Sequence, residues 1–209
     1  MLLFILPLCL LPLIGISVFS YFIAKERITE DRIVLYLQQI AAEVADVIQL
    51  TLLERREESV SMTLYGEFSD YLTGEVTEPP TLLLDKLVVV HEVYDVLALF
   101  DVDGRVVAIN TINRNSNQDV IEYLNDQELE SLQGQSLLRY TPDGTWLQQV
   151  RSSRLGYIDW HISPLVHKLY RYLDNDIAMQ YSIGFAAPVL DERRVVVGGL
   201  LALMNWEFI

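Results

Sequence analysis

The sequence predicts an α+β protein in which an N-terminal transmembrane helix and a long stalk helix precede a mostly antiparallel sheet with flanking helices. Three observations predict this class: an uncharged apolar run, a stretch with helical spacing of apolar residues, and two pairs of apolar runs that each enclose a tight charged turn. We therefore expect the transmembrane helix at residues 2–24, the stalk helix at residues 25–78 and a module built on the sheet at residues 79–209.

Composition excludes several classes of function. The 209-residue chain has a formal net charge of −14, and so acidic a surface repels phosphate backbones, so we expect no nucleic-acid partner. Cys9 is the only cysteine, which excludes an intrachain disulfide and a cysteine-based metal cluster. His161 and His167 have no thiolate or paired carboxylate at ligand spacing. We therefore expect neither a metal nor another cofactor.

The run Leu2–Ala24 carries no charged residue. At about 1.5 Å per residue it reaches about 33 Å, enough to cross a hydrocarbon core of about 30 Å. A cleaved signal peptide is the alternative, but its apolar part would be shorter, would follow a basic segment and would end in a small-x-small cleavage site. We expect a retained anchor. Basic residues after the span favour a cytoplasmic domain, whereas the acidic residues among them and the length of the domain allow translocation.

Residues 25–65 have the spacing of one continuous helix, and no glycine or proline interrupts it before Gly66. A helix of about 40 residues is far longer than the globular mean of about 11 to 12. Its apolar residues step by four, three, four and three positions, so that one stripe contains Ile33, Leu37, Ile40, Val44 and Val47. We expect this stripe to pack against a second copy of the chain, giving a homodimer, or against its own domain.

Two strand-like runs, Val96–Phe100 and Arg105–Ile109, enclose the letters DVDG. Gly104 suits a tight turn because glycine adopts positive φ without strain. The same letters begin a calcium-binding loop, but Arg105 and Ile112 stand where that loop needs oxygen ligands. The sequence therefore predicts a β-hairpin here.

A second hairpin is predicted from strands at Tyr181–Leu190 and Val195–Met204. The nearly continuous apolar character of the second strand indicates a central position in the sheet. Pro188 has no N–H to donate and predicts a bulge or a place at the sheet edge, while Gly198 and Gly199 allow another backbone to approach closely. The order of elements favours helices on one face of the sheet.

The middle of the chain is polar and mixed. One helix is expected over NQDVIEYLNDQELESLQ, ending near Gly134, and another over SPLVHKLYRYL, with Ser163 as its N-cap and Pro164 at its first position. Between them, aromatic residues lie beside charges of both signs, as in a pocket for a small polar ligand. Aromatic plugs beneath long loops are the alternative. The candidate ligand-binding residues are Trp146, Arg154, Tyr157, Asp159, Trp160 and Tyr181.

The chain resembles the extracytoplasmic double-Cache (PAS-like) sensor region of bacterial transmembrane receptors, of the chemoreceptor and sensor histidine kinase type. The resemblance covers nearly the whole chain and rests on the span, the long helix and the stretches LFDVDGRVVAINT, DWHISPLV and YSIGFAAPVLDERRVVVGGLLALMNW. It implies an inner-membrane receptor whose extracytoplasmic domain binds a small ligand and signals through the stalk to a cytoplasmic output domain. It also implies that the chain stops after the distal module.

Members of that family that bind amino acids carry Tyr, Arg, Trp, Tyr and a later Asp, with one residue between Arg and Trp. Arg154 and Trp160 lack that spacing, so the resemblance does not extend to amino-acid recognition. By their chemistry, Arg154 would pair with a carboxylate and Asp159 would accept from an ammonium group, while Tyr157, Trp160 and Tyr181 would form walls.

Motifs of common enzyme classes are absent from the sequence: it contains no G-x-S-x-G, H-E-x-x-H, G-x-x-x-x-G-K or G-x-G-x-x-G. We therefore expect a sensor segment and not an enzyme. A membrane-anchored interaction or scaffold protein with no small ligand is the alternative.

Overall fold

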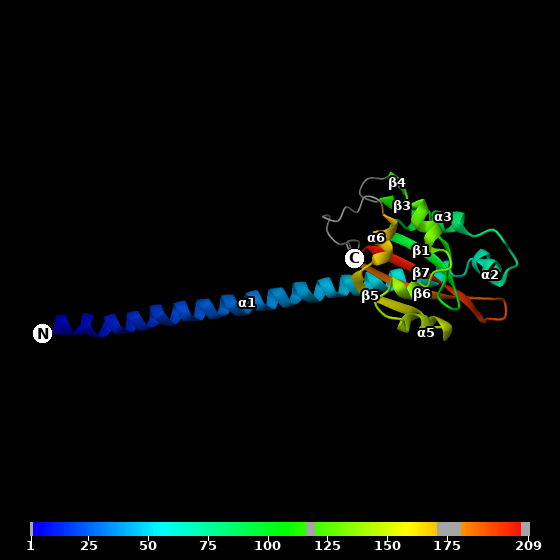
Figure 1. The fold of residues 1–209 in the computed structure, drawn as a ribbon. Helices are drawn as coiled ribbons and strands as arrows, with labels where there is room; N and C mark the ends of the chain where they lie inside the picture. Colours follow the sequence, from blue (N-terminus) through cyan, green and yellow to red (C-terminus); the bar gives the residue numbers. More distant parts are fainter. Residues whose placement is uncertain (1, 116–119, 171–180, 206–209) are drawn as a thin grey trace. The chain divides into compact units, whose positions relative to one another are not determined.

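The computed structural model describes the backbone of residues 2–115, 120–170 and 181–205 (Figure 1). Side chains are described in these ranges except at residues 2–15, 23–24, 26–31, 113–115, 120–123 and 205. The chain divides into two compact units, residues 1–50 and 51–209. Residues 206–209, where the resemblance expects a further module to begin, lie outside the described residues.

One α-helix, α1, runs over Leu2–Met62 and includes the predicted transmembrane helix and most of the predicted stalk. The five residues of the predicted stripe are all exposed. By length and composition, Arg32–Met62 contains a stretch long and apolar enough to cross a membrane, although core helices of soluble proteins and signal sequences pass the same test. Most side chains of the predicted span lie outside the described residues.

The second unit contains a five-stranded antiparallel sheet in the order β2-β1-β7-β6-β5. Its strands are β1 (Tyr94–Asp101), β2 (Val106–Ile109), β5 (Gly156–Ile162), β6 (Tyr181–Leu190) and β7 (Val196–Asn205). Strands β3 (Ile112–Asn115) and β4 (Val120–Tyr123) pair separately as a two-stranded ribbon. The α+β class and the central position of the last strand are thereby confirmed.

Helices cover both faces of the sheet. The end of α1 packs on one face with α2 (Gly66–Thr73) and α3 (Thr81–His91), whose buried residues include Phe68 and Leu84. The other face carries α4 (Asp126–Leu132), the 3₁₀-helix η1 (Leu137–Arg139), α5 (Thr145–Arg151) and α6 (Pro164–Leu169). The expectation of helices on one face was wrong, because the central strands are apolar at successive positions and must bury both sides.

The two hairpin turns follow the sequence prediction. Gly104 has φ +79°, and Oδ1 of Asp101 accepts hydrogen bonds from the backbone N–H groups of Asp103 and Arg105. The carboxylate of Asp101 therefore stabilises a tight turn, as predicted. In β7, a Cβ on Gly198 would collide with the carbonyl oxygen of Phe100, and one on Gly199 would collide with the Phe100 ring. The close approach predicted at these two glycines is confirmed.

The middle of the chain was predicted only in part. The helix predicted over SPLVHKLYRYL is confirmed over Pro164–Leu169 as α6, where the Ser163 hydroxyl accepts from the N–H of Val166 and Pro164 is the first helical residue; residues 171–173 of that prediction lie outside the described residues. In the helix predicted over NQDVIEYLNDQELESLQ, residues 117–119 lie outside the described residues, Val120–Tyr123 form strand β4 instead, and Asp126–Leu132 form a helix, α4, as predicted. Pro188 pairs with Gly199 inside β6, next to a register shift between Val189 and Leu190, and β6 is not an edge strand.

Candidate functional site

A groove of about 920 Å³ lies in the second unit, on the face of the sheet that the end of α1 covers. Three segments line it. They are the end of α1 with the turn after it and the start of α2, the segment from the end of α5 into β5, and β6 with its following turn. The lining residues are Arg56, Val60, Thr63, Leu64, Tyr65, Gly66, Ser69, Ser153, Arg154, Leu155, Tyr157, Phe185, Pro188, Leu190 and Asp191.

The backbone turn at the end of α5 places Arg154 at the groove. Ser153 follows the helix with φ +57°, a left-handed conformation that ends it. The N–H of Arg154 then donates to the carbonyl oxygen of Gln149 at 2.8 Å. Arg154 is thereby held at the start of the segment that becomes β5, with its side chain exposed.

The aromatic residues Tyr157 and Phe185 face each other across β5 and β6. They are register partners, and their ring centroids lie 5.7 Å apart. Partial burial, together with the nearby charge of Asp159, raises the pKa of the Tyr157 phenol. This phenol is therefore protonated at neutral pH, and 43% of the residue remains exposed. It offers a ligand an apolar ring and a hydroxyl donor.

The charged residues of the groove differ in whether they already have hydrogen-bond or ion-pair partners. Among the described residues, the guanidinium groups of Arg56 and Arg154 have no hydrogen-bonding or ion-pair partner. Oδ1 of Asp191 instead accepts from the N–H groups of Arg193 at 2.9 Å and Val195 at 2.7 Å, which stabilises the turn between β6 and β7. The groove thus presents two cationic groups without partners and one carboxylate that is already engaged.

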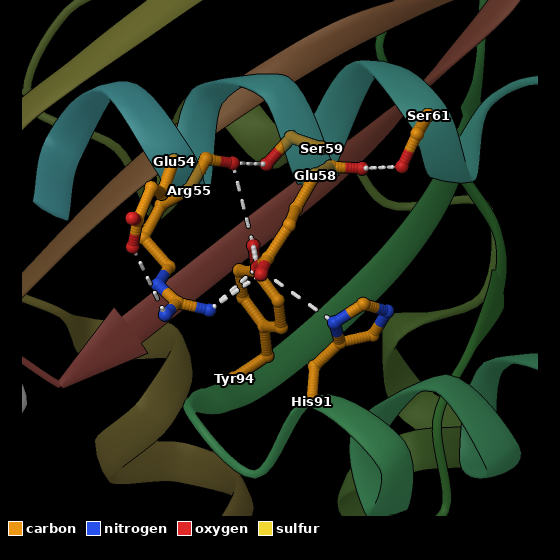
Figure 2. Close-up of polar contacts among 7 residues, drawn as sticks. All are labelled: Glu54, Arg55, Glu58, Ser59, Ser61, His91 and Tyr94. Carbon is orange, nitrogen blue, oxygen red and sulfur yellow. Dashed lines mark hydrogen bonds and ion pairs between the residues drawn. The ribbon is translucent and has the colours of Figure 1, made fainter.

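A polar cluster of Arg55, Glu58, His91 and Tyr94, the Glu58 cluster, attaches the end of α1 to α3 and β1 (Figure 2). Arg55 donates to both carboxylate oxygens of Glu58, at 2.8 and 2.6 Å. The Tyr94 hydroxyl donates to Oε2 of Glu58 at 3.0 Å, and Nδ1 of His91 lies 3.7 Å from the same oxygen. Burial raises the pKa of Tyr94 far above its ordinary value, and Glu58 raises it further, whereas the hydrogen bond with Ser59 and the charge of Arg55 lower it.

Two of the six predicted site residues, Arg154 and Tyr157, line the groove. Trp160 and Tyr181 stack at a centroid distance of 4.3 Å and an interplanar angle of 8°. Asp159 accepts from the N–H of Trp160 where the register of β5 shifts between Ile158 and His161. None of these three lines the groove.

Trp146 lies in the core on the opposite face of the sheet. It is 1% exposed, and the centroid of its ring lies 5.2 Å from that of Phe100. Its indole N–H donates a hydrogen bond to Oγ1 of Thr141. The burial of Trp146 is what the alternative of an aromatic plug expects, and ligand binding by the six residues stays a prediction.

No pattern in the sequence indicates that Arg56, Val60 and Phe185 share a groove. Arg56 stands in the charged run ERREE, which reads as a solvated helix face. Its place beside Phe185 depends on where the end of α1 packs on the sheet. No group of three or more metal-ligating side chains gathers among the described residues.

Comparison with known proteins adds a likeness to solved structures. No family model matches the chain, and no curated protein matches it significantly. The chain is similar to a crystal structure of a domain from a sensory box/GGDEF family protein of Vibrio parahaemolyticus. The identity is 13% and the TM-score is 0.49, over 77% of this chain and 54% of the other, so the chain spans about half the length of that structure.

Proposed function

We propose that this chain is the sensor region of a bacterial membrane receptor, in which a small ligand binds in the groove and is detected by α1. One observation carries the proposal. Arg56 and Val60 of α1, and Leu64 in the turn after it, line the groove. A ligand in the groove would therefore touch the same helix that begins with the uncharged run Leu2–Ala24.

The packing of the end of α1 supports this coupling. Ser59 and Met62 are fully or almost fully buried, and the Glu58 cluster bonds the helix to Tyr94 of β1. A shift of these last turns would have to repack the core or break charge-assisted hydrogen bonds, so the helix has few alternative positions. A ligand that binds more tightly when the helix is in one of these positions would increase the population of that position.

Membrane placement is part of the proposal. The uncharged run would anchor the chain in the inner membrane, and the acidic domain would lie outside the cytoplasm, as the resemblance to double-Cache receptors implies. The exposed stripe of α1, with Ile33 and Val47 at its ends, would pair with a second copy to form a homodimer. The output domain would belong to a longer protein.

A second candidate function is protein interaction without a small ligand. Strand β5 is an edge strand of the five-stranded sheet, and its residues Tyr157, Trp160 and Ile162 are exposed. Exposed sheet edges with apolar side chains accept strands from partner proteins. The binding experiment below separates this candidate from the sensor.

The test uses the full chain in lipid nanodiscs. Pools of organic acids, amines, amino acids and purines are screened by thermal unfolding, and disulfide crosslinking is followed between chains that carry a cysteine at Ile40, with Glu43 as the control position. We expect at least one pool to raise the unfolding midpoint by mass action and to change the rate of crosslinking at Ile40. Stabilisation without a change in crosslinking, or no stabilisation by any pool, contradicts the sensor.

Orientation has its own test. Alkaline phosphatase fused after Leu190 should be active in cells, because the enzyme requires an extracytoplasmic location to fold. An inactive fusion together with an active cytoplasmic reporter at the same position would remove the extracytoplasmic sensor.

A further inference from the structure

We infer that the groove takes a small organic anion that carries an apolar ring, with its charged group held by Arg56 and Arg154. This inference rests on the proposed function and adds the chemical class of the ligand. The structure brings the two guanidinium groups to one groove from segments almost a hundred residues apart.

Arginines close to the groove residues in sequence form ion pairs, whereas, in the part of the chain that the structure describes, the two arginines of the groove do not. Arg55 forms a two-oxygen ion pair with Glu58, and Arg151 bonds to Asp103 and to the carbonyl oxygen of Val102. Arg56 directly follows Arg55 in the sequence, and Arg154 comes three residues after Arg151. Among the described residues, however, neither Arg56 nor Arg154 has a hydrogen-bond or ion-pair partner for its guanidinium group. An acid is the ligand whose charge two such groups complement.

The apolar residues that line the groove favour a ligand whose uncharged part is an apolar ring. Val60, Leu64 and Tyr65 supply apolar surface from one side, and Tyr157 and Phe185 supply it from the other. Aromatic rings and aliphatic side chains beside a few polar groups are typical of small-molecule sites, whose volumes are about 300 to 1,000 Å³. A volume of about 920 Å³ accommodates an acid with an aromatic or similarly bulky body.

Large anions do not fit this description. The chain carries a net charge of −14, which repels nucleic acids and anionic membranes over distances longer than a contact. Two local cations can hold one carboxylate or sulfonate against that background, since charge-assisted contacts act at short range. Among the residues that the structure describes, the one carboxylate that lines the groove, in Asp191, is engaged in its own turn.

The experiment compares an acid with its neutral isostere. Binding of 3-phenylpropionate and 3-phenylpropionamide to the full chain in nanodiscs is measured by equilibrium dialysis, with empty nanodiscs as the blank. The variants are Arg56→Gln, Arg154→Gln and, as a matched control, Arg139→Gln. Arg139 is an exposed arginine of η1 outside the groove. Thermal unfolding of each variant without ligand checks that its fold is intact.

We expect the acid to bind roughly tenfold or more tightly than the amide, and each groove variant to lose roughly tenfold in affinity for the acid alone. Arg139→Gln should bind like the wild type. Equal binding of acid and amide, an equal loss in Arg139→Gln, or no binding of the acid at millimolar concentration overturns the inference. The inference is also overturned if crosslinking shows that a second copy of the chain occupies the groove. If a screened pool without acids still stabilises the chain and changes crosslinking at Ile40, the inference fails while the proposed sensor stands.

Discussion

The hydroxyl of Tyr94, in the first position of β1, donates a hydrogen bond to Oε2 of Glu58 in the last turns of α1, at a distance of 3.0 Å. The two residues are 36 positions apart in the sequence. The same carboxylate accepts two bonds from Arg55. The end of α1 is thus fastened to the sheet by a charge-assisted network and by the burial of Met62.

Tyr94→Phe should lower the free energy of unfolding by about 2 kcal/mol, because a hydrogen bond to a charged acceptor is lost while Glu58 keeps its pair with Arg55. Chemical denaturation of the full chain, followed by near-UV circular dichroism, measures the change. Tyr36→Phe is the control, since Tyr36 is 64% exposed. Equal loss in the two variants would show that the bond to Glu58 contributes nothing specific.

Trp146→Ala should destabilise the domain by about 3 to 5 kcal/mol, because a fully buried indole leaves a cavity. Trp160→Ala should cost only about 1 kcal/mol, since Trp160 is 50% exposed and loses chiefly its stacking on Tyr181. The same denaturation experiment measures both. A larger loss for Trp160 than for Trp146 would contradict the assignment of Trp146 to the core.

Gly198→Ala should destabilise the domain by about 1 to 3 kcal/mol or more, because the new methyl group would collide with the backbone of β1 at Phe100. Gly66→Ala is the matched control, because nothing lies within 4 Å of a Cβ at that position. Thermal unfolding of both variants checks the prediction. A tolerated Gly198→Ala would mean that β1 and β7 are less closely packed than described.

The ion pair between α4 and α6 should make stability depend on pH in a defined window. Nζ of Lys168 lies 2.9 Å from Glu128, which lowers the pKa of Glu128 and raises that of Lys168. The contribution of Glu128 is present above its unfolded pKa of 4.5 and is lost as pH falls through the lowered folded value. That of Lys168 is present below 10.5 and is lost as pH rises through the raised folded value.

Lys168→Met should therefore lower the unfolding temperature slightly at neutral pH, and the difference from the wild type should shrink as pH falls through the lowered pKa of Glu128 and its carboxyl group becomes protonated. Thermal unfolding across this pH range provides the measurement, with Lys86→Met as an exposed control. A difference that persists unchanged at low pH would trace the effect to packing of the lysine stem.

Single cysteines at Ile40 or Val44 should form disulfide crosslinks between chains in membranes, because two apolar stripes on parallel helices bury each other. A cysteine at Glu43 should crosslink much less, since it lies off the stripe. Nonreducing gel electrophoresis after mild oxidation measures the yield. Equal yields at the three positions would contradict a defined dimer seam.

Elements whose signals are local could be predicted from the amino-acid sequence. The DVDG turn, the N-cap Ser163 before Pro164 and the two apolar strands of the last hairpin each depend on neighbouring residues, and the structure has them where the pattern predicts. Even the close approach at Gly198 could be predicted, because a glycine in a central strand indicates that another backbone lies near.

Which face of the sheet each helix covers, and which residues meet in the groove, depends on long-range packing that no local pattern in the sequence specifies. Trp146 and Trp160 belong to one stretch of aromatic and charged residues in the sequence, yet one indole lies in the core and the other on the surface. Arg56 and Arg154 share a groove because α1 ends on the sheet beside β5 and β6. Local patterns cannot specify that position, since it follows from burying Met62, Phe68 and the apolar face of the sheet together.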